Sequence, residues 1–374
     1  MNERNSKMEL LGSAPIPKAL LAMGLPTMIG MMINALYNLV DAYFVGGLGT
    51  SQMGAISVAF PLGQVVVGLG LLFGNGAASY ISRLLGHGET ETADRVASTA
   101  LYSSISVGAV IIICTILFLR PILRLLGATE SILPYAEIYA GIYVVSSIFN
   151  IFNVTMNNIV TSEGAAKTTM CALLTGAVLN MVLDPVFIYV LHLGVAGAAI
   201  ATAISQIVST AVYLCYVFRK KSVFSFSIKK CCFSSEIMSE ILKIGIPTLV
   251  FQLLTSLSVA LINLKARPYG DSVIAGMGAV TRIISMGSLM VFGFLKGFQP
   301  IAGYSYGAKK YDRLHEAIKT SIIWSTIFCA VFGLGMALCS TAVISQFTKG
   351  DVQMIEIGRR SLTANGISFL LFGF

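Results

Sequence analysis

Two acidic residues stand alone in long apolar stretches of this chain. Asp41 is the only charged residue in 19–82, and Asp184 is the only Asp, Glu, Lys or Arg in 168–218. A charged side chain at membrane depth costs about 2.5–3.5 kcal/mol on insertion scales, so such acids usually serve an ion path, a proton relay or a substrate site. The pair therefore predicts coupling to a cation. The alternative is that each carboxyl is neutral and hydrogen-bonded in a packing role.

The positions of these acids in their apolar segments predict a shared depth. Asp41 and Asp184 lie about five and about seven residues before the ends of their segments, and Thr202 lies about seven residues into the next one. At about 1.5 Å per residue, all three lie roughly 8–12 Å below the same membrane edge. Asn180 and Asp184 share a helix face, and hard cations prefer such oxygen ligands. We therefore predict a cation-coupling site, for Na⁺ or H⁺, formed by Asp41, Asn180, Asp184 and Thr202.

Amide side chains recur at helical spacing in the same segments. In the first segment Asn34, Asn38 and Asp41 follow the spacing i, i+4, i+7. In the fourth segment Asn150, Asn153 and Asn157 follow the spacing i, i+3, i+7. Such stripes either join helices, at about 0.6 kcal/mol per bond in one membrane protein, or line a wet cavity. Lys296 lies far from either end of its segment, so it either contacts substrate or pairs structurally. The predicted substrate cavity comprises Asn34, Tyr37, Asn38, Asn153, Asn157, Gln206, Gln252 and Lys296.

The composition predicts an all-α polytopic membrane protein. Hydrophobic residues make up 56% of the 374 residues and charged residues only 11%, against roughly 25% charged in soluble domains. The mean hydropathy is +0.82. A spanning helix needs about 20 apolar residues. Ten segments meet this need: 17–46, 52–82, 93–119, 132–161, 168–191, 195–218, 237–264, 272–306, 314–343 and 355–374.

Basic residues gather in alternate loops, which predicts the orientation. The N-terminal segment and the loops near residues 83–95, 167, 219–243 and 309–319 carry most of the Lys and Arg residues. The positive-inside rule puts these loops and the N-terminus in the cytoplasm of a multi-pass inner-membrane protein. The net charge of +8 therefore indicates no nucleic-acid partner. The opposite loops hold only Arg120, Arg124, Lys265, Arg267 and Lys349.

The two halves of the chain resemble each other. GLPT at 24–27 recurs as GIPT at 245–248, and Asp94-Arg95 recurs as Asp312-Arg313. The first half has six spans, an even number, so both halves enter the membrane from the same side. Repeats of this kind are related by a pseudo-two-fold axis along the membrane normal. We expect an N-terminal six-helix lobe at 1–218, an inter-lobe loop at 219–243 and a C-terminal lobe at 244–374. Prolines inside the first span of each half, Pro26 and Pro247, are either hinges or static bends.

No pattern in the sequence indicates an enzyme. There is no HExxH motif and no Ser/His/Asp set, and the seven cysteines lack metal-ligand spacing. Glycine-rich stretches follow no predicted strand, so they do not form a nucleotide-binding loop. We expect no cofactor beyond the coupling ion. The expected partners are a small-molecule substrate and membrane lipid, with the protein acting as a monomer.

Distinctive motifs occur along nearly the whole chain. They are GLP at 24–26, VDAYFV at 40–45, LG at 48–49, NMVLDPVFI at 180–188, GVAGAA at 194–199 and GFQPIAGYSYGA at 297–308. These runs resemble those of the multidrug and toxic compound extrusion (MATE) family of cation-coupled exporters. The resemblance implies a twelve-span plan, drug export by alternating access, and the branch whose N-terminal lobe holds the coupling acids. It also implies that Asp41, Asn180, Asp184 and Thr202 are the coupling residues.

Three departures from the family pattern qualify this implication. About ten spans are present instead of twelve, which suggests a truncated second lobe. Some branches carry an acid in the seventh span, and here Gln252 is nearby instead, which argues against coupling through the second lobe. Lys296 lies where the family often has Gln or another polar residue, which argues against a purely cationic substrate range. The leading interpretation is a Na⁺- or H⁺-coupled antiporter of amphiphilic drug-like compounds. The alternatives are a flippase of lipid-linked saccharides or a non-transporting remnant.

Overall fold

The chain is an all-α membrane protein. The computed structural model describes residues 3–266, 271–345 and 352–373, and within them it contains helices and no β-strand. Nine of the described helices are long and apolar enough to cross a membrane. The helices are α1 Glu3–Gly12, α2 Ile16–Gly46, α3 Thr50–His87, α4 Thr90–Leu117, α5 Leu119–Leu125, α6 Leu133–Ser162, α7 Ala166–Pro185, η1 Val186–Val190, α8 Gly194–Phe218, η2 Ile228–Lys230, α9 Ser235–Ala266, α10 Asp271–Gly307, α11 Tyr311–Leu338, α12 Ser340–Ser345 and α13 Val352–Phe369.

The predicted segments differ from these helices at two places. The segment 314–343 divides into α11 and the short α12. The segment 355–374 corresponds to α13, which is not among the nine candidate spans. Its first half carries Glu356, Arg359 and Arg360, joined by ion pairs of 3.1 Å and 2.6 Å. Counting apolar residues alone concealed this charged cluster. Two basic residues used for orientation, Arg267 and Lys349, lie outside the described residues.

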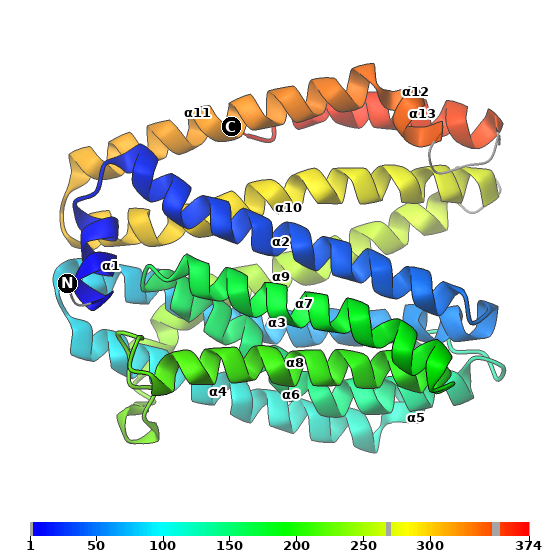
Figure 1. The fold of residues 1–374 in the computed structure, drawn as a ribbon, viewed down its shortest axis with the longest axis horizontal. Helices are drawn as coiled ribbons and strands as arrows, with labels where there is room; N and C mark the ends of the chain where they lie inside the picture. The colour runs from blue at the N-terminus through cyan, green and yellow to red at the C-terminus, as the bar shows by residue number, and fades with distance from the viewer. Residues whose placement is uncertain (1–2, 267–270, 346–351, 374) are drawn as a thin grey trace.

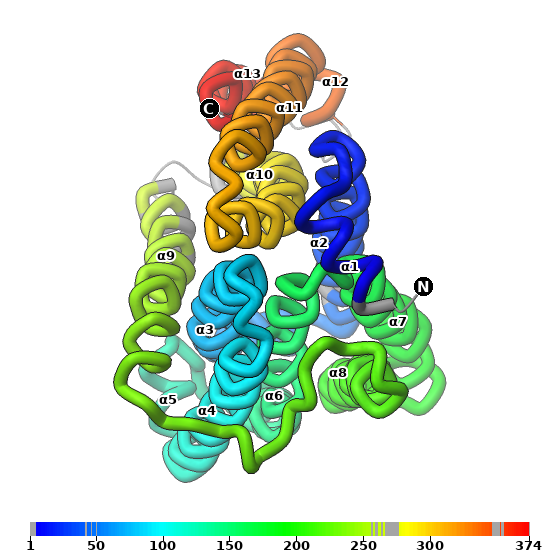
Figure 2. Tube along the Cα trace, turned by 90° about the vertical axis from the view of Figure 1, so that its left-hand side faces the viewer, coloured from blue at the N-terminus to red at the C-terminus, as the bar shows by residue number. Residues whose placement is uncertain are grey.

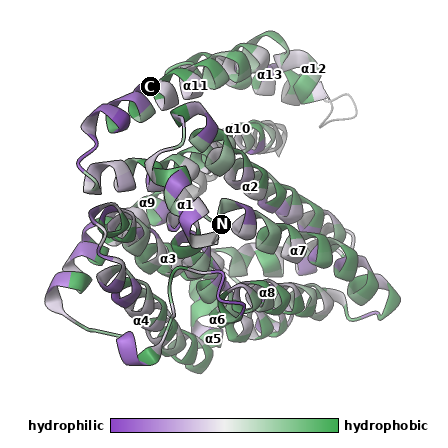
Figure 3. Ribbon diagram, turned by 60° about the vertical axis from the view of Figure 1, so that its left-hand side comes forward, coloured by the Kyte–Doolittle hydropathy of each residue, from purple (hydrophilic) through white to green (hydrophobic). Residues whose placement is uncertain are grey.

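The long helices run side by side and place the two sets of loops at opposite ends (Figure 1). One end carries α1 and the α8–α9 connection, and the other carries α5 and α12. We call the end that carries α1 the α1 end. Hydrophilic residues gather there, whereas the sides of the helices are largely hydrophobic (Figure 3). The basic loops named above lie there, because α1, the α8–α9 connection and the α10–α11 turn share it.

The contacts between helices follow the internal repeat. Viewed along the bundle, α10–α13 form one group, α3–α8 form another, and α2 and α9 run along opposite sides (Figure 2). The first span of each half packs on the second span of the other, α2 on α10 and α9 on α3. Glycines allow these close crossings. A Cβ on Gly297 would lie 2.5 Å from the Gly24 backbone, and one on Gly245 would lie 2.1 Å from the Leu72 carbonyl oxygen.

Polar contacts at the α1 end tie the two halves together. The Arg83 guanidinium pairs with Glu240 across α3 and α9 at 2.8 Å. On α11, Arg313 donates to the carbonyl oxygen of Leu11 in α1 and to that of Ala14 in the connection between α1 and α2. These contacts hold the α1 end closed in the conformation described here.

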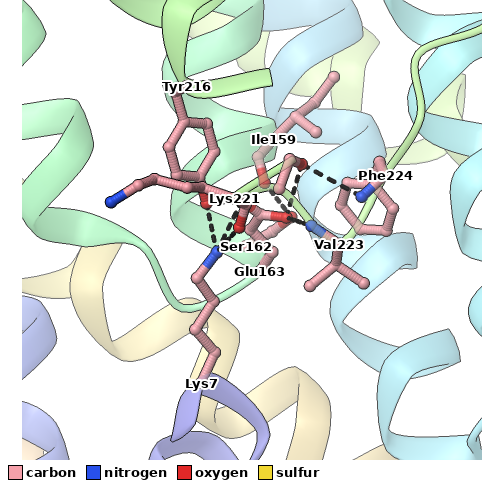
Figure 4. Close-up of polar contacts among 9 residues, drawn as sticks. Lys7, Ile159, Ser162, Glu163, Tyr216, Lys221, Val223 and Phe224 are labelled. Atoms are coloured by element: carbon pink, nitrogen blue, oxygen red, sulfur yellow. Dashed lines mark hydrogen bonds and ion pairs between the residues drawn. The ribbon is translucent and has the colours of Figure 1, made fainter. Parts of the chain in front are cut away.

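A buried carboxylate anchors α1 and the α8–α9 connection (Figure 4). Glu163 follows the last residue of α6 and is fully buried. It pairs with Lys7 of α1 at 3.4 Å and accepts a hydrogen bond from the Tyr216 hydroxyl. It also accepts the Val223 backbone N–H at 2.6 Å and the Ser222 hydroxyl at 2.9 Å. Three segments distant in sequence, namely α1, the end of α6 and the stretch 216–223, thus meet at one carboxylate.

Candidate functional site

The two isolated acids come together in the structure. Asp41 lies on α2 and Asp184 lies in the last turn of α7, where Pro185 ends the α-helix and the π-helix η1 begins. Their carboxyl groups lie within electrostatic range of each other, and Asp184 is fully buried. Two carboxylates so close in a buried site repel each other unless a proton or a metal cation neutralises part of their charge. The packing of α2 on α7 therefore creates a site that requires positive charge.

The predicted amide and hydroxyl partners complete the same cluster. Asn180 is one turn before Asp184 on α7, and its Nδ2 donates to Asp184 Oδ1 at 3.2 Å. The same nitrogen lies 3.3 Å from Thr202 Oγ1 of α8. Both Asn180 and Thr202 are buried. All four residues predicted for the coupling site are thus brought together by α2, α7 and α8.

Three oxygen atoms in this cluster lack a hydrogen-bond donor. Asp41 Oδ1, Asn180 Oδ1 and Asp184 Oδ2 are buried and have no hydrogen-bond partner among the described residues. A buried polar atom without a partner costs about 1–3 kcal/mol. Na⁺ is a hard cation, and an all-oxygen set suits it; a proton would satisfy one carboxylate. Among the described residues no group of three or more His, Cys, Asp or Glu side chains is placed to hold a metal ion.

Three tyrosines surround the acid pair. Tyr37 of α2 contacts Thr202, and its hydroxyl lies within electrostatic range of Asp41. Tyr139 and Tyr143 of α6 are also within range of Asp41. Their rings stack with centroids 6.0 Å apart. Tyr37 was predicted to line the substrate cavity, whereas the two α6 tyrosines were not predicted. The sequence feature that could have indicated them is their i, i+4 spacing, which places both hydroxyl groups on one face of an otherwise apolar span.

Several residues predicted for the substrate cavity instead join α6 to α8. Asn153 Nδ2 donates to the Gln206 backbone oxygen at 2.9 Å and to its side-chain Oε1 at 2.8 Å. The Thr210 hydroxyl donates to Asn153 Oδ1 at 2.9 Å. Asn157 Nδ2 donates to the Tyr213 hydroxyl at 3.0 Å. These amides therefore act as interhelical hydrogen bonds in this conformation, one of the two roles considered for them.

The remaining predicted cavity residues occupy three different places. Asn34 and Asn38 are exposed on α2, and Asn38 Nδ2 donates to the Asn34 backbone oxygen at 2.8 Å. Gln252 of α9 donates to Gln64 of α3 at 3.1 Å. Lys296 of α10 donates to Asn157 Oδ1 of α6. The structure thus brings Lys296 to Asn157 across the two halves, but it does not gather all eight predicted residues around one space.

Comparison with known proteins identifies the family. The MatE family model matches residues 26–186 and 247–374. The multidrug export protein MepA of Staphylococcus aureus (strain NCTC 8325 / PS 47) is 31% identical over 377 residues, covering 99% of this chain and 83% of that protein. Two solved structures match at 28% identity, covering 98% of this chain and 82% of theirs. They are MATE in complex with MaL6, with a TM-score of 0.92, and an outward-facing MATE family transporter of the MOP superfamily, with a TM-score of 0.91.

These matches agree with the resemblance seen in the sequence motifs and with the helical membrane fold. The family consists of transporters and not of enzymes. The chain therefore belongs to the MatE family of multi-pass membrane transporters.

Proposed function

We propose that this protein is a cation-coupled antiporter that exports drug-like, amphiphilic compounds. The observation that carries the proposal is the cluster of three unpartnered buried oxygens on Asp41, Asn180 and Asp184. A membrane transporter with a buried site that requires a cation can couple entry of that cation to a change of conformation. The name of the MepA relative, a multidrug export protein, supports the direction and the class of substrate.

Alternating access would occur between the lobes 1–218 and 244–374. The described contacts between the halves hold the α1 end closed, including Arg83–Glu240 and the crossing of Gly24 with Gly297. The likeness to an outward-facing transporter supports an orientation in which the α1 end is cytoplasmic. The basic loops at that end support the same orientation in the cell membrane.

The cation must bind the two conformations with different affinity in order to drive transport. In the closed conformation described here, α2 brings Asp41 to Asp184 of α7 and so completes the site. A movement of α2 away from α7 would divide the site and release the ion. We propose Pro26 and Pro247 as hinges, because both interrupt the interior of a helix that crosses between the halves. The protein would act as a monomer surrounded by lipid.

The test is efflux of a fluorescent substrate from proteoliposomes under a Na⁺ gradient or a proton gradient, each applied alone. Asp41→Asn and Asp184→Asn should each abolish gradient-driven efflux, because each removes a carboxylate from the cation site. Asp312→Asn is the matched control, since Asp312 is exposed at the start of α11. Efflux at the wild-type rate by both site variants, at matched protein content, would show that the acids have only a packing role.

A further inference from the structure

Mostly polar side chains of the two halves pack closely together around Lys296, away from the acid pair, and we call this cluster the crevice. It is formed by α3, α6 and α10, and it contains hydroxyl and amide side chains from three helices together with one amine. None of its described lining residues is acidic. Its lining residues are Ala78, Ser82, Asn158, Thr161, Ser162, Lys296, Gln299 and Pro300.

Lys296 supplies the only positive charge among these lining residues. Its amine donates to the neutral amide oxygen of Asn157, whose own amide nitrogen donates to Tyr213. No described carboxylate pairs with Lys296. A buried ammonium group is normally paired with an acid, because its transfer from water is costly. The crevice therefore contains an amine that lacks an anionic partner in this conformation.

A second donor lies beside the amine. Gln299 follows Lys296 by three residues on α10, so the two side chains share a helix face. Within the described residues its amide has no hydrogen-bond partner. The Ser82 and Thr161 hydroxyls bond to carbonyl oxygens of their own helices, at 2.7 Å and 2.6 Å. A hydroxyl can rotate to donate elsewhere. Amine, amide and hydroxyl donors together suit a carboxylate or phosphate oxygen.

Close packing of the two halves covers the crevice in the conformation described here. Next to Lys296 on α10, the Gly297 backbone meets Gly24 of α2. Separation of the lobes at the α1 end would break the Lys296–Asn157 hydrogen bond and expose the amine to the side from which an exporter loads. Closure of the lobes would return Asn157 to Lys296 and displace whatever the amine had bound.

We propose that this crevice is the loading site for the anionic group of the substrate, so that the exported class includes amphiphiles bearing a carboxylate or a phosphate. The inference rests on the export function proposed above and names a substrate class for it. Lys296 binds the anion in the cytoplasm-facing state, and Asn157 competes with the anion during closure. Release of the substrate is thus linked to the re-formation of one hydrogen bond between the lobes.

The test compares a rhodamine that has a free carboxylate with its methyl ester, which differs in that group alone. The measured quantity is the ratio of the initial efflux rates of acid and ester from proteoliposomes. Lys296→Gln should lower this ratio by about tenfold or more, the size expected for loss of a charge-assisted hydrogen bond. Lys296→Arg should preserve the ratio. Lys319→Gln, which removes an exposed charge from α11, should leave the ratio unchanged.

A second variant tests the same point without removing the lysine. Asn157→Asp gives Lys296 a carboxylate partner within the protein and should also lower the ratio of acid to ester. Efflux of neither dye by the wild-type protein would refute the export function itself. Efflux of the ester with no transport of the acid, or an unchanged ratio in both Lys296→Gln and Asn157→Asp, would overturn the loading site while leaving export intact.

Discussion

The crossing of α2 and α10 offers a sharp test of how the α1 end is closed. A Cβ built on Gly297 would lie 2.5 Å from both the backbone nitrogen and the Cα of Gly24. Non-bonded carbon atoms prefer about 3.5–4.0 Å, and a backbone cannot rotate away as a side chain can. Gly297→Ala should therefore push the two helices apart by roughly 1 Å at this crossing.

The energetic cost follows from overpacking. Such insertions typically cost about 1–3 kcal/mol, partly offset by up to about 1 kcal/mol from the better helix propensity of alanine. A net cost of about 1–2 kcal/mol changes a conformational ratio by about 5- to 30-fold. Gly278→Ala on the same helix is the matched control, because no atom lies within 4 Å of its Cβ position. It should gain about 0.4–1 kcal/mol instead.

The assay combines thermal unfolding in detergent with efflux from proteoliposomes. Gly297→Ala should lower the Tm and the efflux rate, because it destabilises the closed α1 end, whereas Gly278→Ala should raise the Tm slightly and preserve efflux. Equal Tm values and equal efflux for the two variants would refute the reasoning, since the close backbone contact would then be absent from the functional protein.

Two further predictions concern Glu163 and the helix prolines. Burial raises the pKa of Glu163, and Lys7 opposes part of this shift. The native state therefore holds this proton more tightly than the unfolded chain, so the stability due to Glu163 is complete below its unfolded pKa and is lost as pH rises through its native pKa. Glu163→Gln should remove this slope from a Tm-against-pH curve, and parallel curves for variant and wild type would contradict the assignment. Pro26→Ala and Pro247→Ala should raise the Tm by restoring helix hydrogen bonds and slow efflux, whereas unchanged efflux would make the prolines static bends.

The membrane class and most of the spans were predictable from the sequence, because apolar length is a local property that each segment carries by itself. The pairing of Asn180 with Asp184 was predictable for the same reason, since i, i+4 spacing places both on one face before any other helix is known. Local counting failed at α13. There Glu356, Arg359 and Arg360 interrupt the apolar run, and their ion pairs hold a helix that is not a candidate span.

Only the tertiary structure decided which polar side chains meet. The approach of Asp41 to Asp184 depends on the packing of α2 against α7, and the anchoring of α1 by Glu163 depends on the ends of α6 and α8. The rotation of each helix about its axis also remained open. Asn153 could join helices or line a cavity, and it faces α8. Lys296 could contact substrate or pair structurally, and it donates to Asn157. Helical spacing relates residues on one helix to each other, but the direction in which the shared face points is set by packing against the neighbouring helices.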